Sequence, residues 1–221
     1  MFNLFVSKAS ESSGYSIRPL GYVALIGLLL VLLALVAFMT ASSKTRTFST
    51  KQLVFSAISL SLATVTNMIV LFDAPMGGSI TLCSMLFIVL IGYWFGPKIG
   101  ITTAIAFGVI QLLTRPTILS IPQVLFDYIF AFGSLGLSGF FANKKMGLIK
   151  GYLVSILGRL VFSTISGILF FAEYAEGANV FLYSLSYNAF YIGIEGAITL
   201  VILLMPQISK ALSQVKRFAL E

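Results

Sequence analysis

Three ionisable side chains lie within long apolar runs of this sequence, namely Asp127, Arg159 and Glu195, and Glu173 lies just beyond one such run. A charge inside a membrane-spanning segment costs at least about 2.5 kcal/mol, so each of these residues is a candidate for a functional site. Arg159 and Glu195 both fall near the middle of their segments, where an unpaired charge is the costlier arrangement. We therefore expect these two residues to form a structural ion pair.

Asp127 differs from that pair because it lies only about 8 Å from the start of its segment, at 1.5 Å of helix rise per residue. With Arg159 assigned to Glu195, the sequence offers it no obvious basic partner at that depth. A carboxylate without a basic partner is suited to a cationic ligand. The alternative is a carboxylate whose oxygens are satisfied by hydroxyl groups and water.

Aromatic side chains gather at the same depth. They are Tyr128, Phe170, Phe171, Tyr183, Tyr187 and Tyr191. The last three recur every four residues and so share one stripe of a helix, close to Asn188. A carboxamide in lipid needs partners, and it can recognise a ligand through paired hydrogen bonds. These residues together predict a pocket that opens outward; for Tyr183 alone, a place in an interfacial aromatic belt is the alternative.

The composition requires lipid as the solvent. Of 221 residues, 58% are hydrophobic and 10% are charged, and the mean hydropathy is +1.03. An ordinary soluble domain has about 25% charged residues, so a water-soluble protein is excluded. At about 20 residues per span, the chain has room for six or seven helices and for no soluble domain of any size.

The sequence contains no histidine, which removes the most common metal ligand and general base. We therefore expect no metal site, no cofactor and no catalytic residue, and we expect the single Cys83 to be a small buried hydrophobe. The alternative is an intramembrane enzyme that uses Asp127 and Glu195 as acid and base. Their depths differ by roughly 13 Å, which is too far for a pair of catalytic carboxylates.

The expected fold is that of an all-α integral membrane protein. Residues 1–45 comprise a polar tail, one extra N-terminal transmembrane helix and the start of a polar linker that covers residues 41–51. Residues 46–221 form a six-helix membrane domain. Proline, glycine or charge interrupts the chain between its segments, which are about residues 52–72, 80–95, 99–113, 122–141, 148–172 and 181–205.

Basic residues set the expected orientation. If all seven segments span the membrane, ten Lys and Arg residues share one face with Glu221 as its only acid, while most of the acidic residues lie on the other face. We expect the basic face to be cytoplasmic, which places the N-terminus outside and the C-terminus inside the cell membrane. The net charge of +7 then reflects topology and does not indicate nucleic acid.

Small residues on the segment 52–72 could admit a neighbouring helix. Ala57 and Ser61 have the spacing that allows close helix approach, within this chain or with a partner, and Ser59 and Ala63 have the same spacing. The sequence has no Walker A motif, so the chain alone has no recognisable machinery to hydrolyse ATP.

Several motifs resemble the substrate-binding membrane subunits, or S components, of energy-coupling factor vitamin transporters. The run from Pro75 to Leu82 with Gly96-Pro97 is shared with that group. The later motifs are similar to the thiamine-specific S component, and they are Pro122 to Tyr128, Leu135 to Gly139, Arg159 with Ser166-Gly167, and Tyr183 to Asn188. The resemblance covers about residues 50–215 and implies a six-helix S-component core, to which the first helix is an addition.

The resemblance also implies roles for individual residues. A carboxylate followed by Tyr pairs with the thiazolium cation of thiamine in that family, and the matching positions are Asp127 and Tyr128. Tyr183 and Asn188 match ligand contacts on the last helix. Where the family usually has His and Trp, this sequence has Ser163 and Phe171.

By this resemblance the chain is a thiamine-binding S component that captures the cationic vitamin from outside. It would work with a transmembrane coupling protein, placed against Ala57 and Ser61, and with two cytoplasmic ATPase subunits. The alternatives are an S component for another vitamin or a thiamine precursor, and a secondary transporter that works alone. In the second alternative, Arg159 and Glu195 would relay protons.

Overall fold

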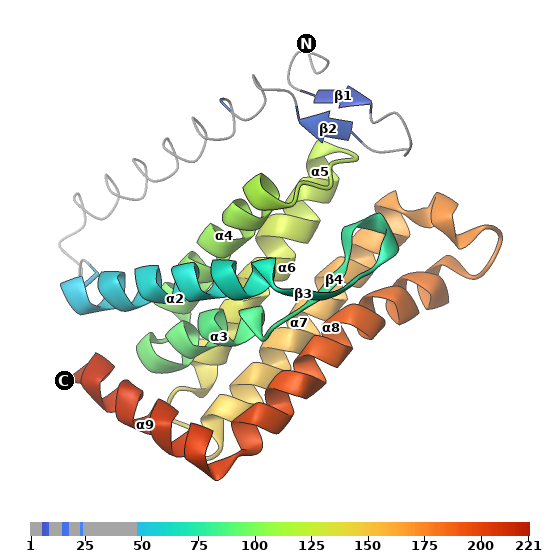
Figure 1. Ribbon diagram of the computed structural model, residues 1–221. Coiled ribbons are helices and arrows are strands. Elements are labelled where there is room, and N and C mark those ends of the chain that lie inside the picture. The colour runs from blue at the N-terminus through green and yellow to red at the C-terminus, as the bar shows by residue number, and fades with distance from the viewer. Residues whose placement is uncertain (1–5, 9–14, 18–22, 24–47) are drawn as a thin grey trace.

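Helices make up most of the computed structural model, which describes residues 6–8, 15–17, 23 and 48–221 (Figure 1). The short strands β1 (Val6–Lys8) and β2 (Tyr15–Ile17) pair antiparallel within the segment that we predicted to be a polar tail. The predicted extra helix apart from Val23, residues 41–47 of the linker and the boundary after residue 45 lie outside the described residues.

Each of the six apolar segments of residues 46–221 contains a helix. These helical segments are α2 (Thr50–Met68), α3 (Ser84–Phe95), α4 (Pro97–Thr114), the run Ile121–Phe141, α7 (Gly147–Phe170) and α8 (Val180–Leu204). Among the described residues, α4, the run 121–141, α7 and α8 are long and apolar enough to cross a membrane, and α3 is a shorter apolar helix. The count of six spans plus one extra helix therefore stays a prediction.

The run Ile121–Phe141 is a continuous helix whose winding changes along its length. It passes from α5 (Ile121–Val124) through the π-helix η3 (Leu125–Phe130) and α6 (Ala131–Gly133) to the 3-10 helix η4 (Ser134–Phe141). We predicted one helix here but not these changes. A π-turn is rare and is often found at functional sites.

The run Ile121–Phe141 packs closely against α4. Gly108 on α4 faces the carbonyl oxygen of Tyr128 on η3, and a Cβ at residue 108 would overlap that oxygen. Further along, the η4 residues Gly136 and Gly139 are equally close to the backbone where α4 begins. The absence of side chains at these positions lets the run lie against α4 along its length.

A hairpin that we did not predict follows α2. The helix ends at Met68, and the chain continues as β3 (Val70–Asp73), the 3-10 turn η2 (Pro75–Gly77) and β4 (Ser79–Thr81). The two strands are antiparallel, with Asp73 opposite Ser79. Gly77 has a φ of +91°, a conformation that residues with a side chain rarely adopt.

The basic C-terminal segment also forms a helix, α9 (Pro206–Leu220), which packs on α2, α3 and α8. Proline at its first position suits a helix start, because proline lacks the amide hydrogen that a first turn leaves unpaired. Lys216 holds α9 in place, since its ammonium donates to the Ala142 carbonyl at 3.0 Å and lies 3.9 Å from the centre of the Tyr93 ring.

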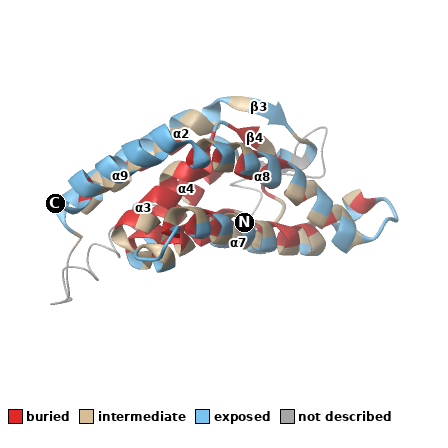
Figure 2. Cartoon of the chain, turned by 90° about the horizontal axis from the view of Figure 1, so that it is seen from below, coloured by how far each residue is buried: buried red, intermediate tan, exposed pale blue. Residues whose placement is uncertain are grey.

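Burial is concentrated on α3, α4 and the inner faces of α7 and α8, whereas much of α2 and α9 is exposed (Figure 2). The exposed surface includes many large apolar side chains, such as Leu157 and Val161 on α7 and Val201 on α8. So many exposed apolar side chains are unfavourable in water and favourable against lipid tails.

We expect Gly108→Ala to lower the midpoint of thermal unfolding in detergent. The new Cβ would overlap the carbonyl oxygen of Tyr128 and force η3 away from α4, and overpacking of this kind costs about 1–3 kcal/mol. Gly193→Ala on α8 is the matched control, because nothing lies within 4 Å of the position of its Cβ. Equal midpoints for the two variants would contradict the prediction.

Candidate functional site

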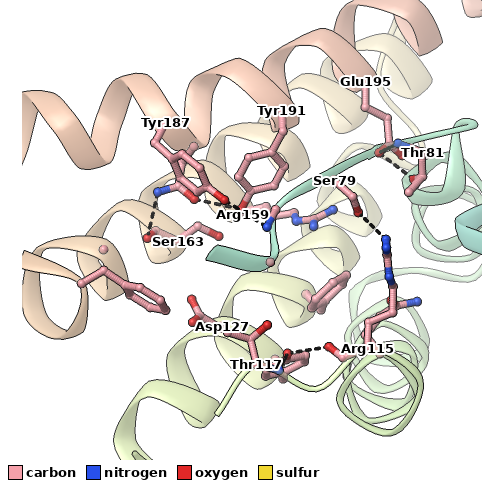
Figure 3. Close-up of a pocket in the computed structure, with 18 of the residues that line it drawn as sticks. Ser79, Thr81, Arg115, Thr117, Asp127, Arg159, Ser163, Tyr187, Tyr191 and Glu195 are labelled. Carbon is pink, nitrogen blue, oxygen red and sulfur yellow. Dashed lines mark hydrogen bonds between the residues drawn. The ribbon is translucent and has the colours of Figure 1, made fainter. Parts of the chain in front are cut away.

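A cavity lies at one end of the bundle, bordered by the β3–β4 hairpin, the loop after α4, η3, α7 and α8 (Figure 3). It offers about 110 Å³ to the centres of water-sized molecules. One water needs about 10–15 Å³ by the same measure, so the cavity has room for a small organic molecule.

The candidate ligand-binding residues all line this one cavity. They are Asp127, Tyr128, Ser163, Phe171, Tyr183 and Asn188. Arg159 and Glu195 line it as well, and so do Tyr187 and Tyr191 of the predicted tyrosine stripe. The three tyrosines of the stripe therefore all border the cavity.

Asp127 lies on the π-turn and accepts a hydrogen bond from the Nε2 atom of Gln123 at 2.6 Å. Gln123 is fully buried, and its amide group also donates to the Thr117 carbonyl and accepts from the Leu119 amide. These bonds orient Gln123 and thereby position Asp127. Sequence reasoning missed Gln123, although its place four residues before Asp127 on a helix was a usable signal.

Tyr128 offers its ring to the cavity, because its hydroxyl group is already engaged. The hydroxyl donates to the Arg115 carbonyl at 2.9 Å and accepts from the Thr117 amide at 2.7 Å. The ring stacks on Phe132 with 6.4 Å between the ring centres and 19° between the planes. Tyr128 thus ties the loop after α4 to η3.

The predicted ion pair between Arg159 and Glu195 is wrong. Among the described residues, the ion pairs within 4.0 Å are Arg115 with Asp73 and Arg217 with Glu221. The Arg159 guanidinium instead lies over the Phe132 ring, 4.4 Å from its centre, and its buried Nε atom has no hydrogen-bond partner. Figure 3 shows Arg159 between Asp127 and the helix that carries Tyr191.

Glu195 is satisfied by hydrogen bonds and needs no cation. It is 2% exposed and accepts from the Thr81 amide at 3.1 Å, the Thr81 hydroxyl at 2.8 Å, the Ser84 hydroxyl at 3.0 Å and the Met85 amide at 3.4 Å. Two of these donors belong to the first residues of α3, where free amide groups favour a negative charge. The carboxylate therefore joins α8 to β4 and to the start of α3.

Asn188 makes hydrogen bonds within the protein. Its Nδ2 atom donates to the Ser163 and Ser184 carbonyls at 3.3 and 2.8 Å, and its Oδ1 atom accepts from the Tyr191 hydroxyl at 2.8 Å. Asn188 thus links α7 to α8 and orients Tyr191. Of its hydrogen-bonding capacity, one lone pair on Oδ1 is left for a ligand.

The hairpin is fastened over the cavity by side chains from two other elements. The Tyr187 hydroxyl accepts from the Gly78 amide at 3.0 Å and donates to the Pro75 carbonyl. Arg115 pairs with Asp73 at 2.7 Å and donates to the Ser79 hydroxyl at 2.9 Å. We did not predict this ion pair from the sequence.

The remaining candidates occupy distinct places. Phe171 directly follows α7 and packs on Tyr174, and Ser163 is buried beside Asn188. On α2, Ala57 and Ser61 are exposed, while Ser59 and Ala63 are buried against the bundle. Only the first of the two small-residue pairs is therefore open to a partner helix.

Two comparisons of the sequence with known proteins match thiamine transporters. The sequence model of a family described as Thiamine transporter protein matches residues 53–214. The curated thiamine transporter ThiT of Bacillus subtilis (strain 168) is 34% identical over 132 residues, which cover 53% of this chain and 68% of that protein.

Two solved structures share the fold. A structure of ThiT from Listeria monocytogenes is 24% identical with a TM-score of 0.59, covering 71% of this chain and 96% of that one. The S component of a bacterial ECF transporter is 20% identical with a TM-score of 0.50, covering 69% of this chain and 92% of that one. The bundle described above is therefore an S-component fold.

We expect Glu195→Gln to lower the unfolding midpoint, because the amide group of glutamine would face donors and leave a buried hydrogen-bonding group unsatisfied. Such a group costs about 1–3 kcal/mol. Glu173→Gln removes the same charge from an exposed position at the cavity end of the molecule and serves as the control. Thermal unfolding of both purified variants in detergent measures the difference, and a shift of the same size in both would refute the role given to Glu195.

Proposed function

Because the chain belongs to the thiamine transporter protein family, we propose that the cavity binds thiamine and that the chain is the S component of an energy-coupling factor transporter. The observation that carries this proposal is the place of Asp127. It is a partly buried carboxylate on the cavity wall that forms no ion pair within 4.0 Å among the described residues. The other cavity carboxylate, Glu195, is fully used by hydrogen bonds.

Asp127 is the group that opposes the thiazolium cation of thiamine in this proposal. A charge-assisted contact inside a partly dry cavity is stronger than one in water. The rings of Tyr128, Phe171 and Tyr183 border the same space and can stack on the flat heterocycles. The stacking supplies affinity for any aromatic ligand, while Asp127 selects for a cation.

Arg159 and Asn188 are suited to the neutral end of the ligand. A pyrimidine ring carries nitrogen acceptors and an amino group. The Arg159 guanidinium has donors to offer, and the free lone pair on Asn188 Oδ1 can accept from the amino group. Ser163 and Phe171 replace the His and Trp usual in the family, so the thiamine contacts at these two positions differ from the usual ones.

Selection against neutral molecules follows from the same arrangement. A neutral ligand would exclude water from Asp127 without supplying a counter-charge, which is an energetic penalty. A thiamine precursor that contains only the pyrimidine part would bind less well for this reason, whereas a precursor that contains the cationic thiazolium would retain the contact.

Transport in this proposal needs partners, because the chain has no Walker A motif. A transmembrane coupling protein and two cytoplasmic ATPase subunits would supply the energy. The exposed pair Ala57 and Ser61 on α2 is the proposed contact for the coupling protein. The cavity end faces outside and the α9 end faces the cytoplasm, so the protein captures its ligand from the exterior of the cell membrane.

The chain is a transporter component rather than an enzyme, as its family membership shows. The acid–base alternative based on Asp127 and Glu195 is therefore dropped. The secondary-transporter alternative rested on a pair of Arg159 and Glu195, and the described residues show no ion pair between these two side chains.

Equilibrium binding of thiamine to purified wild-type protein and to Asp127→Asn tests the mechanism. We expect the wild type to bind and the variant to bind about 10–100-fold more weakly, because a hydrogen-bonded charge contact contributes about 1.5–3 kcal/mol. Glu176→Gln, which removes an exposed carboxylate outside the cavity, should bind like the wild type. A wild type that fails to bind thiamine, or an Asp127→Asn variant of unchanged affinity, would end the proposal.

Uptake assays separate the S component from a transporter that works alone. We expect proteoliposomes with the chain alone to accumulate no labelled thiamine, and proteoliposomes with coupling protein and ATPases to accumulate it when ATP is present. Accumulation by the chain alone, driven by a proton gradient, would favour the secondary transporter.

A further inference from the structure

A second and larger cavity lies at the other ends of α7 and α8. It has a volume of about 550 Å³ and is bordered by α9, the end of α8, the start of α7 and Tyr93 of α3. It shares no residue with the first cavity, which is bordered by the later half of α7 and by residues 183–195 of α8.

The charges at the second cavity favour an anion. Its lining contains the three cations Lys144, Lys216 and Arg217, and one acidic side chain, Glu221. Glu221 neutralises little, because it meets Arg217 only at 4.0 Å and both side chains are largely exposed, by 66% and 80%. Lys216 is held by the Ala142 carbonyl and the Tyr93 ring, neither of which cancels its charge.

Apart from Ser209, Ser213 and Tyr93, the rest of the lining is apolar. Leu148 and Ile149 contribute from α7, Leu203 from α8, and Leu212 and Leu220 from α9. A free phosphate or nucleotide would meet these side chains unfavourably, since they offer it no hydrogen bonds. The combination of basic and aliphatic groups fits a molecule that is anionic at one end and hydrocarbon at the other.

The helix that forms one wall of the cavity is itself suited to a membrane surface. α9 carries Lys210, Lys216 and Arg217, and it exposes Phe218 by 69% and Leu220 by 56%. A basic amphipathic helix of this kind lies where headgroups meet acyl chains and is attracted to anionic lipids. The cavity therefore opens at the depth where phospholipid headgroups are available.

We propose that the second cavity binds one anionic phospholipid, with its phosphate group among Lys144, Lys216 and Arg217 and the upper part of an acyl chain against the leucines. The lipid would fill the space between α9 and the start of α7 and fasten α9 to the bundle. This inference goes beyond the proposed function and does not depend on which vitamin occupies the first cavity.

Native mass spectrometry of the full chain in detergent tests the proposal. The probes are phosphatidylglycerol and phosphatidylcholine with identical acyl chains. We expect the wild type to retain phosphatidylglycerol in preference, and Lys144→Gln/Arg217→Gln to bind it at least about tenfold more weakly. Both substituted side chains are exposed, so the variant should keep the wild-type unfolding midpoint without lipid.

Lys98→Gln/Lys210→Gln is the matched control, because it removes the same charge from exposed positions at the same end but outside the cavity. It should retain phosphatidylglycerol like the wild type. Equal loss in the two double variants would mean a diffuse surface attraction and would overturn the site. A wild type that retains the two lipids equally would overturn the site too. That result would favour an acidic surface of a partner protein as the occupant of the cavity.

Discussion

The hydrogen bonds to the buried carboxylate of Glu195 are the interaction on which the cavity depends. A carboxylate in an apolar bundle must find donors, and Glu195 finds them on Thr81, Ser84 and Met85. These bonds fix β4 against α8 and so fix the hairpin that borders the cavity. From the hairpin, the contacts continue through Arg115 to the Tyr128 hydroxyl, and in the same loop from Thr117 to Gln123 and Asp127. The position of Asp127 thus depends on a network of contacts that begins at Glu195 on α8.

The change in helical winding serves the same end. In η3 the backbone adopts a π-turn, and Asp127 and Tyr128 are placed on this turn. The turn is possible because Gly108 leaves room for the Tyr128 carbonyl. A regular α-helix over the same residues would aim these two side chains differently, since each π-turn adds a residue to the ladder of hydrogen bonds. The backbone conformation of the site therefore depends on how η3 packs against α4.

The two ends of the molecule differ in chemistry. At one end, polar and aromatic groups from several elements converge on an internal cavity, and the hairpin is fastened above it. At the other end, basic side chains and leucines surround a second cavity beside an amphipathic helix. The distribution of Lys and Arg along the sequence already separates these ends, because short loops between helices alternate between the two faces of the membrane.

The sequence by itself determined the class of protein, six of the helical segments of residues 46–221 and the residue types that meet at the cavity. Composition and hydrophobic runs suffice for the first two, and the resemblance to a family brings Asp127, Tyr128, Ser163, Phe171, Tyr183 and Asn188 together. Only the tertiary structure decided which side chains interact with one another. Depth along a helix suggested Arg159 and Glu195, but hydrogen bonding depends on direction as well, and Glu195 faces the hairpin while Arg159 lies over Phe132. The hairpin, the π-turn and the packing of α9 were likewise decided by contacts between segments far apart in the sequence, which local patterns do not encode.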